Sequence, residues 1–365
     1  MRYEKIACIV NKSGLDVYRT IEYFSEFSLD FYLYIFPNSK INNPAIFRHY
    51  HQGILKKEKE CCLYKGKNKI IIYILQFIYY LYFLKKFKIK KTYIVVVDLQ
   101  FLFFNSIIRL FNKNKLVFWI GDAFPNRYES LLIYLVDSLG RFYMNNLEHV
   151  FFSSPNLKKL YLNNYASNKE KKVITLGIKN LLLNRNPELN LFGFIGYLRK
   201  GQGIELIFEV LKKNKKFVFE IIGDGEYKND LEELTKKYNI QKQVKFFGYL
   251  DYKKLIDISS RWKIALAPYF PSKDNYTYYA DPGKIKLYLE LELPIIMTRI
   301  TYIAQEIETQ MAGEIVTYDP INISDAIKKI QNNYDIYSNG VKKLKNNYFY
   351  KKVFQDGFQS LEQQI

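Results

Sequence analysis

A stretch in the last quarter of the chain places a proline, a glycine and a lysine at the expected start of a helix. Residues 279–298 predict a loop, a helix that begins near Pro282, a short turn and a buried strand. Proline is tolerated in the first turn of a helix because its missing N–H would be unpaired there. The free N–H groups around Gly283, with the Lys284 ammonium beside them, can hold a negatively charged group.

A second cationic turn follows the strand-like run 191–195. The sequence GYLRKGQG places Arg199 and Lys200 between Gly196 and Gly203. Glycine lets backbone N–H groups approach a ligand, and the two cations supply the charge that a diphosphate needs. Taken alone, this pattern also fits many Rossmann turns that bind nothing.

Two further strands end in turns that could face a ligand. Residues 217–222 are followed by a glycine turn that contains Gly223 and Asp224, and residues 244–247 are followed closely by Tyr249. Gly223 could equally be a plain turn residue.

Strand-like apolar runs alternate with amphipathic helical stretches along the chain, which predicts an α/β fold with parallel sheets. The first half is expected to contain strands at 4–10, 30–35, 93–97, 115–120, 149–152 and 172–175. The second half is expected to contain strands at 191–195, 217–222, 244–247, 264–267, 294–298 and 314–317. Sheets of this kind bind ligands at the carboxyl ends of their strands.

The segments of the second half, taken in order, resemble the retaining family-four enzymes, also called glycosyl transferases group 1. The likeness covers about residues 190–318. It implies a GT-B fold, with two Rossmann-like domains that face each other across a cleft. The expected domains are an acceptor-binding domain over 1–180, a nucleotide-sugar-binding domain over 190–345, and a helix over 346–365 that packs back on the first.

The resemblance also suggests how the donor is held. Two cations usually grip the diphosphate of the donor, but their positions hold Tyr197 and Gln202 here. Arg199 and Lys200 are the natural substitutes, and Lys284 is expected to be the second clamp.

The carboxylate that binds the ribose is missing as well, because its position holds Leu287. The nucleoside is therefore expected near Tyr249 and Asp281, although Asp281 could instead cap the helix. Glu290 and Glu292 are expected on a solvated face.

In the first domain, the resemblance places two residues close to the substrates. Gly14 lies in the loop after the first strand, and Asp122 follows a strand and precedes a loop that ends in Pro125. Asp122 could orient the acceptor or act as a general base, or it could be a turn residue. Asp98 and Gln100 are expected to face the same cleft.

The sequence contains no metal-binding motif, and its three histidines are scattered, with His49 and His51 expected to be exposed. Transfer is therefore expected to need no metal and no cofactor besides a nucleotide diphosphate-sugar donor, because cations and helix N-termini can neutralise the leaving diphosphate. Three cysteines cannot form a disulfide framework, which favours a reducing cytoplasm.

The net charge of +19 is concentrated in one block. Residues 56–91 hold eleven lysines against two glutamates, a net charge of +9, and enclose the nearly uncharged run 70–84. As a helix this run would be about 22 Å long, short of the roughly 30 Å hydrocarbon core of a bilayer. It could be buried in the first domain or lie at an anionic membrane surface. Nucleic-acid-binding motifs are absent.

The sequence thus predicts a hexosyltransferase that acts on a lipid-linked or growing surface glycan, such as a capsule or lipopolysaccharide precursor. We expect it in the cytoplasm or at the inner face of the cell membrane, with retention of anomeric configuration implied by the resemblance alone. Two alternatives stay open: a nucleotide-sugar epimerase of the same fold, and a non-catalytic membrane-associated partner of a transferase.

Overall fold

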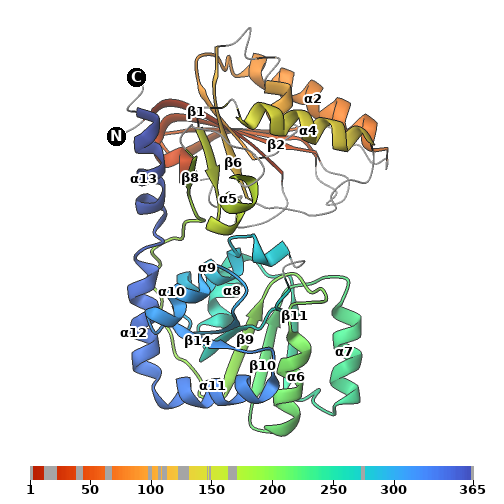
Figure 1. Ribbon diagram of the computed structural model, residues 1–365, viewed down its shortest axis with the longest axis vertical. Helices are drawn as coiled ribbons and strands as arrows, with labels where there is room; N and C mark the ends of the chain where they lie inside the picture. Colours follow the sequence, from red (N-terminus) through yellow and green to blue (C-terminus); the bar gives the residue numbers. More distant parts are fainter. Residues whose placement is uncertain are drawn as a thin grey trace. The chain divides into compact units, whose positions relative to one another are not determined.

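The computed structural model describes residues 3–11, 23–37, 44–61, 68–97, 101–105, 108, 113–121, 131–145, 147, 149–162, 171–272 and 276–362. The chain forms two compact units (Figure 1). The first contains Met1–Leu176 and Phe354–Ile365, and the second contains Gly177–Val353. The chain therefore passes from one unit to the other twice.

The first unit is built on an eight-stranded sheet in the order β4-β3-β2-β1-β5-β6-β7-β8. Its strands are β1 (Tyr3–Asn11), β2 (Ser28–Phe36), β3 (Ile46–His51), β4 (Ile54–Glu60), β5 (Tyr93–Val96), β6 (Lys115–Ile120), β7 (His149–Phe152) and β8 (Lys171–Val173). Six of them pair in parallel, as predicted. The unalternating apolar runs of β5 and β6 are buried, as expected of strands covered on both faces.

The edge of this sheet differs from the prediction. β3 pairs antiparallel with β2, and β4 pairs antiparallel with β3, so a hairpin extends an otherwise parallel sheet. The exposure predicted for His49 and His51 is wrong, because both rings are half-buried against the Asp30 carboxylate, at 2.8 and 3.0 Å. These contacts help to fix the hairpin on β2.

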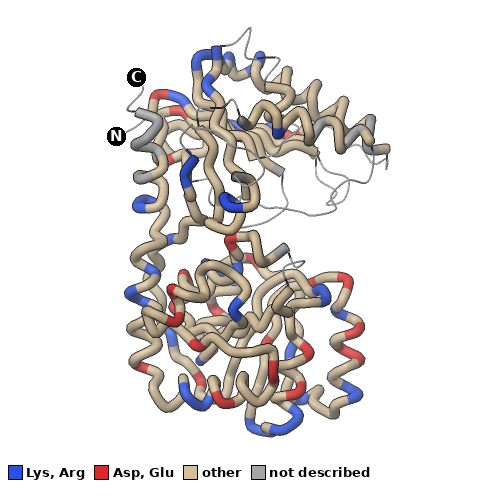
Figure 2. The backbone as a smooth tube through the Cα atoms, viewed as in Figure 1, with Lys and Arg blue, Asp and Glu red and all other residues tan. Residues whose placement is uncertain are grey.

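The described helices of the first unit are η1 (Tyr23–Glu26), α2 (Lys69–Lys86), α4 (Leu131–Asn145) and α5 (Pro155–Leu162), together with most of α13 (Tyr350–Glu362). Phe354 of α13 packs against Phe24 and Trp119, with ring centroids 5.1 and 5.9 Å away. Figure 2 draws α2 and α4 mostly in the colour of uncharged residues, whereas helices of the second unit carry both charges along their lengths. None of the helices in the described stretches combines the length and apolar character needed to cross a bilayer.

The second unit contains a six-stranded, wholly parallel sheet in the order β11-β10-β9-β12-β13-β14. Its strands are β9 (Leu191–Ile195), β10 (Val218–Ile222), β11 (Val244–Gly248), β12 (Ile264–Ala267), β13 (Ile295–Thr298) and β14 (Gly313–Val316). Its helices are α6 (Ile204–Lys213), α7 (Lys228–Lys237), α8 (Tyr252–Ser259), η3 (Tyr276–Tyr278), α9 (Gly283–Glu290), α10 (Ala304–Thr309), α11 (Pro320–Asn332) and α12 (Tyr334–Lys345).

Buried apolar side chains fill both faces of this sheet. One core includes side chains of α9, α10 and α12, and the other includes side chains of α6, α7 and α11. The strand order reverses between β9 and β12, so the loops after these two strands leave in opposite directions. Ligands of open α/β sheets bind at such a reversal, outside the carboxyl ends of the strands.

Candidate functional site

The turns after β9, β10 and β11 are joined by backbone hydrogen bonds. The Gly196 N–H donates to the Ile222 carbonyl oxygen at 3.0 Å, and the Gly223 N–H donates to the Gly248 carbonyl oxygen at 2.8 Å. Gly223 has a φ of 142°, and a Cβ added there would lie 1.9 Å from the Gly196 carbonyl oxygen. Only glycine fits this close approach, which brings the ends of the three strands together.

One tyrosine of helix α9 forms hydrogen bonds with two strands of the sheet and so holds the helix near the turn after β9. The buried Tyr288 hydroxyl accepts the Ile195 N–H of β9 at 3.0 Å and donates to the Leu266 carbonyl oxygen of β12 at 3.2 Å. The start of α9 therefore lies at the reversal of the strand order. The sequence did not indicate this role for Tyr288, because nothing in the local pattern distinguishes it from an ordinary core tyrosine.

Lys284, in the first turn of α9, lies directly over Gly196. A Cβ added to Gly196 would be 2.8 Å from Lys284 Cε, so the glycine makes room for the lysine chain. Lys284 Nζ donates to Gln202 Oε1 at 2.6 Å and lies 3.6 Å from the centroid of the Phe194 ring. Gln202 is itself buried, so the two side chains form a fixed pair between α9 and the turn after β9.

Lys284 is a cation whose described contacts include no carboxylate. Burial holds the pKa of its ammonium group well below the usual range, and the positive charge of Arg199 lowers this pKa further. Among the described carboxylates, none pairs with Lys284. An uncompensated cation in a buried place is unfavourable, and a bound anion would relieve it.

The two cations of the glycine turn face different groups. Arg199 is close enough to Lys284 to lower its pKa, and it also lowers the pKa of Glu226. Lys200 is exposed, and its ammonium lies 5.7 Å from the centroid of the Tyr227 ring. Of the two predicted substitutes, Arg199 is therefore the one that the structure places with Lys284.

For three other residues predicted for the site, no contact among the described residues shows a binding role. Asp224 is exposed, and its carboxylate accepts the Gly225 N–H at 2.9 Å. Tyr249 is 69% exposed just after β11, and Gly283 is the first residue of α9. Their binding roles stay predictions.

Asp281 has a contact that its predicted role did not include. Its side chain is fully buried, accepts the Tyr302 O–H at 2.9 Å and lies 3.4 Å from Lys286 Nζ. Burial lowers the pKa of Lys286 to about 8, and the Asp281 carboxylate opposes this shift. The arrangement favours an internal structural role for Asp281, because a carboxylate enclosed by a cation and a tyrosine has little capacity left for a ribose.

The solvated position predicted for Glu290 is wrong. Its carboxylate is buried and accepts hydrogen bonds from the Lys179 N–H, at 3.0 Å, and from the Tyr252 hydroxyl. Glu290 thus fixes the segment that enters the second unit. Glu292 is half-buried, pairs with the buried Lys345 at 3.0 Å and has a φ of 56°, the left-handed geometry in which turn glycines are common.

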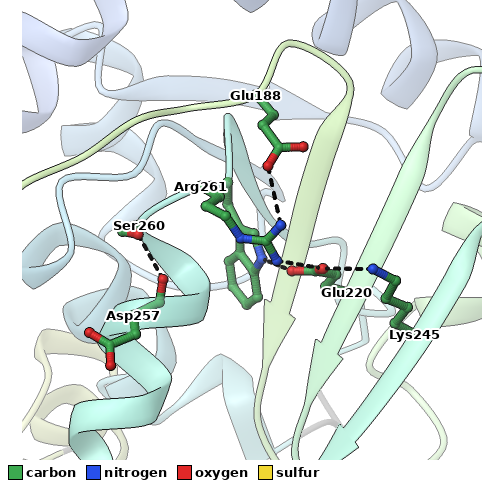
Figure 3. Close-up of polar contacts among 7 residues, drawn as sticks. Glu188, Glu220, Lys245, Asp257, Ser260 and Arg261 are labelled. Atoms are coloured by element: carbon green, nitrogen blue, oxygen red, sulfur yellow. Dashed lines mark hydrogen bonds and ion pairs between the residues drawn. The ribbon is translucent and has the colours of Figure 1, made fainter.

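A third buried carboxylate, Glu220 of β10, is fully occupied by structural partners (Figure 3). It accepts from Arg261 Nη2 at 2.9 Å and Trp262 Nε1 at 2.8 Å, with Lys245 Nζ at 3.8 Å, and Arg261 also pairs with Glu188 at 3.2 Å. These contacts join the segment that precedes β9 to β10, to β11 and to the residues just before β12. Glu220 therefore stabilises the sheet and does not belong to the Lys284 site.

The acceptor-side predictions cannot be placed. Gly14, Asp98, Gln100 and Asp122 lie outside the described residues. In the part of the chain that the structure describes, no group of three or more His, Cys, Asp or Glu side chains is arranged to bind a metal ion. Transfer without a metal stays a prediction.

Several solved structures match nearly the whole chain. Sucrose-phosphate synthase from Thermosynechococcus elongatus matches with a TM-score of 0.74 and 13% identity, over 99% of this chain and 98% of that chain. The Anabaena protein Alr3699/HepE in complex with UDP-glucose matches with a TM-score of 0.71 and 12% identity, over 99% and 100%. The lipopolysaccharide outer core galactosyltransferase WaaB matches with a TM-score of 0.65 and 12% identity, over 98% and 99%. The predicted GT-B fold is confirmed.

The family comparison agrees with the fold. Residues 182–347 match the family described as glycosyl transferases group 1, and this range lies within the second unit. The second unit is thus a domain of that family, and the protein is a glycosyltransferase. A comparison with curated proteins found no matching sequence.

Proposed function

We propose that the second unit binds a nucleotide diphosphate-sugar and that the protein transfers its sugar to a lipid-linked or growing surface glycan. One observation carries the donor assignment: the half-buried Lys284 lies over Gly196 at the reversal of the strand order, near the positive charge of Arg199 and without a counter-ion among the described carboxylates. A diphosphate supplies the missing negative charge. The likeness to a protein solved with UDP-glucose supports this class of donor.

The Lys284 and Arg199 cations could assist the departure of the diphosphate from the donor sugar. The bond between the anomeric carbon and the diphosphate oxygen breaks, the anomeric carbon bonds to a hydroxyl oxygen of the acceptor, and that hydroxyl loses its proton. Negative charge grows on the leaving oxygen as the bond breaks. We propose that Lys284 and Arg199 stabilise this charge, and that the low dielectric around Lys284 strengthens the effect.

The remaining assignments extend the proposal from the residues of the sequence. The exposed ring of Tyr249 is proposed to lie against the nucleoside, and Gly223 and Gly283 to border the phosphates. From the first unit, Gly14 and Asp122 are proposed to serve the acceptor, with Asp122 as the group that receives or directs the acceptor proton. We also propose metal-independent transfer with retention of configuration.

The acceptor is proposed to be a precursor carried by a lipid, such as one for capsule or lipopolysaccharide, which places the enzyme in the cytoplasm at the inner face of the membrane. The support is the lysine-rich block 56–91 around α2. The likeness to a lipopolysaccharide galactosyltransferase is compatible with an acceptor of this kind.

The donor site can be tested with two neighbouring cations of the same turn. We expect UDP or GDP to raise the melting temperature of the wild-type protein, because a ligand that binds the native state stabilises it. Arg199→Ala should lose most of this rise, since it removes the charge beside Lys284, whereas Lys200→Ala should keep it.

Three results would contradict this assignment. Equal losses in both variants would assign the diphosphate to the whole turn and not to the Arg199–Lys284 pair. Absence of stabilisation by any nucleoside diphosphate would favour the non-catalytic partner. Conversion of a nucleotide-sugar to its isomer without any acceptor would favour the epimerase.

A further inference from the structure

Helix α2 is apolar on both of its sides. Its inner side packs in the core through Tyr80 and Phe83, both with no exposed surface. Its outer side exposes Ile71, Ile74, Ile78 and Leu81, each between 39% and 53%. Buried and lipid-facing positions were alternatives for this run in the sequence, and the structure gives the helix one buried side and one exposed apolar side.

Helix α4 repeats this pattern elsewhere in the first unit. Its exposed apolar side chains recur at intervals of three to four residues, which places them along one side of the helix. They are Leu131, Tyr134, Leu135, Leu139 and Phe142, each between 43% and 73% exposed. This stripe was not predicted from the sequence.

The topology puts both helices on the same face of the sheet. β4 and β5 are parallel, because β4 is antiparallel to β3, β3 is antiparallel to β2, and β2, β1 and β5 are parallel. The connections β4–α2–β5 and β6–α4–β7 both move along the sheet toward β8. Right-handed crossovers that move in the same direction place their helices on the same face.

In the first unit, the large apolar side chains that the structure shows as exposed gather in one part. Every exposed large apolar side chain among the described residues of that unit belongs to α2, α4 or the adjoining strand β4. In the second unit, such side chains are scattered over the linker, turns and helices. A concentration of this kind marks a surface that binds something.

Positive charges border the exposed apolar side of α2 and indicate which kind of partner this surface suits. Strand β4 exposes Lys56, Lys57 and Lys59, and α2 ends with Lys85 and Lys86. The Lys59 ammonium donates to the Tyr82 hydroxyl at 2.9 Å, and the Lys86 ammonium lies 5.4 Å from the centroid of the same ring. Apolar side chains bordered by tyrosine and lysine suit the surface of a membrane with anionic lipids, where apolar groups enter the lipid and lysines remain at the headgroups.

We propose that the outer sides of α2 and α4, together with β4, form one docking surface for an anionic lipid bilayer. The docking surface specifies how the protein would reach the membrane location proposed above. It rests on the proposed function for the choice of a lipid-linked acceptor. Its new element is α4, which carries no lysine cluster and contributes apolar insertion.

Flotation with liposomes tests the docking surface. The full-length protein should float with vesicles of phosphatidylcholine and phosphatidylglycerol and much less with phosphatidylcholine alone, and salt should weaken the binding. Leu135→Glu/Phe142→Glu in α4 should reduce the floated fraction roughly tenfold, as should Ile74→Glu/Ile78→Glu in α2. The matched control is Ile321→Glu/Ile336→Glu, which changes exposed residues of the second unit and should float like the wild type.

Several outcomes would overturn the proposal. Undiminished flotation of the α4 variant would exclude α4 from the surface, and equal flotation with neutral vesicles would exclude the role of charge. A wild-type dimer that the α4 variant converts to a monomer, without lipid binding, would make this face an interface between copies. Stabilisation by UDP or GDP, measured on the same proteins, separates these failures from failure of the donor site, because the docking variants should retain it.

Discussion

Two lysines in the first turns of α9 have opposite surroundings. Lys284 contacts a neutral amide and aromatic rings and faces the like charge of Arg199, whereas Lys286 contacts the Asp281 carboxylate and the Tyr302 hydroxyl. Burial lowers the pKa of both ammonium groups, but neighbouring carboxylates raise that of Lys286 in part. A half-buried cation without a partner among the described carboxylates is suited to receive an anion, while one that is already paired is suited to hold the structure together.

The largest expected effect separates the two lysines by ligand binding. Lys284→Met should weaken the binding of the favoured nucleoside diphosphate about 100-fold, because a charge-assisted contact with the ligand is lost. Without nucleotide, the free energy of unfolding should stay the same or rise, since an uncompensated buried charge is removed. Calorimetric titration and denaturant unfolding measure the two quantities. Loss of stability with unchanged binding would make Lys284 a structural residue.

Lys286→Met should have the reverse effect. It leaves the Asp281 carboxylate buried without its cation, so the free energy of unfolding should fall by about 3 kcal/mol. Nucleotide affinity should stay within about twofold of the wild type, because the two lysines share no described partner. Adding Asp281→Asn should restore part of the lost stability. Weaker nucleotide binding at unchanged stability would instead assign Asp281 and Lys286 to the nucleoside site.

The pH dependence of stability should report Lys286 directly. Its pKa is about 8 in the folded protein, against 10.5 for an ordinary lysine. Between these values the unfolded chain binds a proton that the folded protein has released, so stability should rise with pH. The part of this rise that depends on Lys286 should reach about 2 kcal/mol by pH 10. It is measured as the difference between the unfolding curves of wild type and Lys286→Met.

That measurement should stop near pH 10. Burial raises the pKa of Tyr302 and Tyr348, so the folded protein keeps protons that the unfolded chain loses above this pH. Their effect on stability has the opposite sign. Parallel curves for the two proteins between pH 8 and pH 10 would mean that Lys286 has an ordinary pKa.

Elements with a clear local sequence pattern could be predicted, and those without one could not. The strands of the second unit were predicted to within one residue at each end, because buried parallel strands are short unbroken apolar runs. A helix start near Pro282 was predicted from the proline and glycine, and α9 begins at Gly283. The hairpin β3–β4 was missed, since the exposed, charged sequence of β4 gives no signal of a strand.

The environment of Asp281 could not be predicted for a different reason. Its partners are Lys286 on α9 and Tyr302 beyond the next strand, and Tyr348 stacks on the same lysine at 3.2 Å from much later in the chain. Only the packed fold brings these side chains together. A local pattern therefore identified the charged residues at the start of α9 but could not distinguish a lysine without a described carboxylate partner from an internally paired one.

Exchanging Lys284 with its partner should give the smallest net effect. Lys284→Gln alone should weaken nucleotide binding about as much as Lys284→Met, and Gln202→Lys alone should place two ammonium groups at the 2.6 Å contact and destabilise the protein. The double variant moves the cation to the turn position where the resembling enzymes carry one. Its nucleotide affinity should stay within about fivefold of the wild type, since the two groups act as one unit. A double variant that binds as weakly as Lys284→Gln would contradict this expectation. It would mean that the ligand requires the cation on α9 itself, and that a cation elsewhere beside Gly196 cannot replace it.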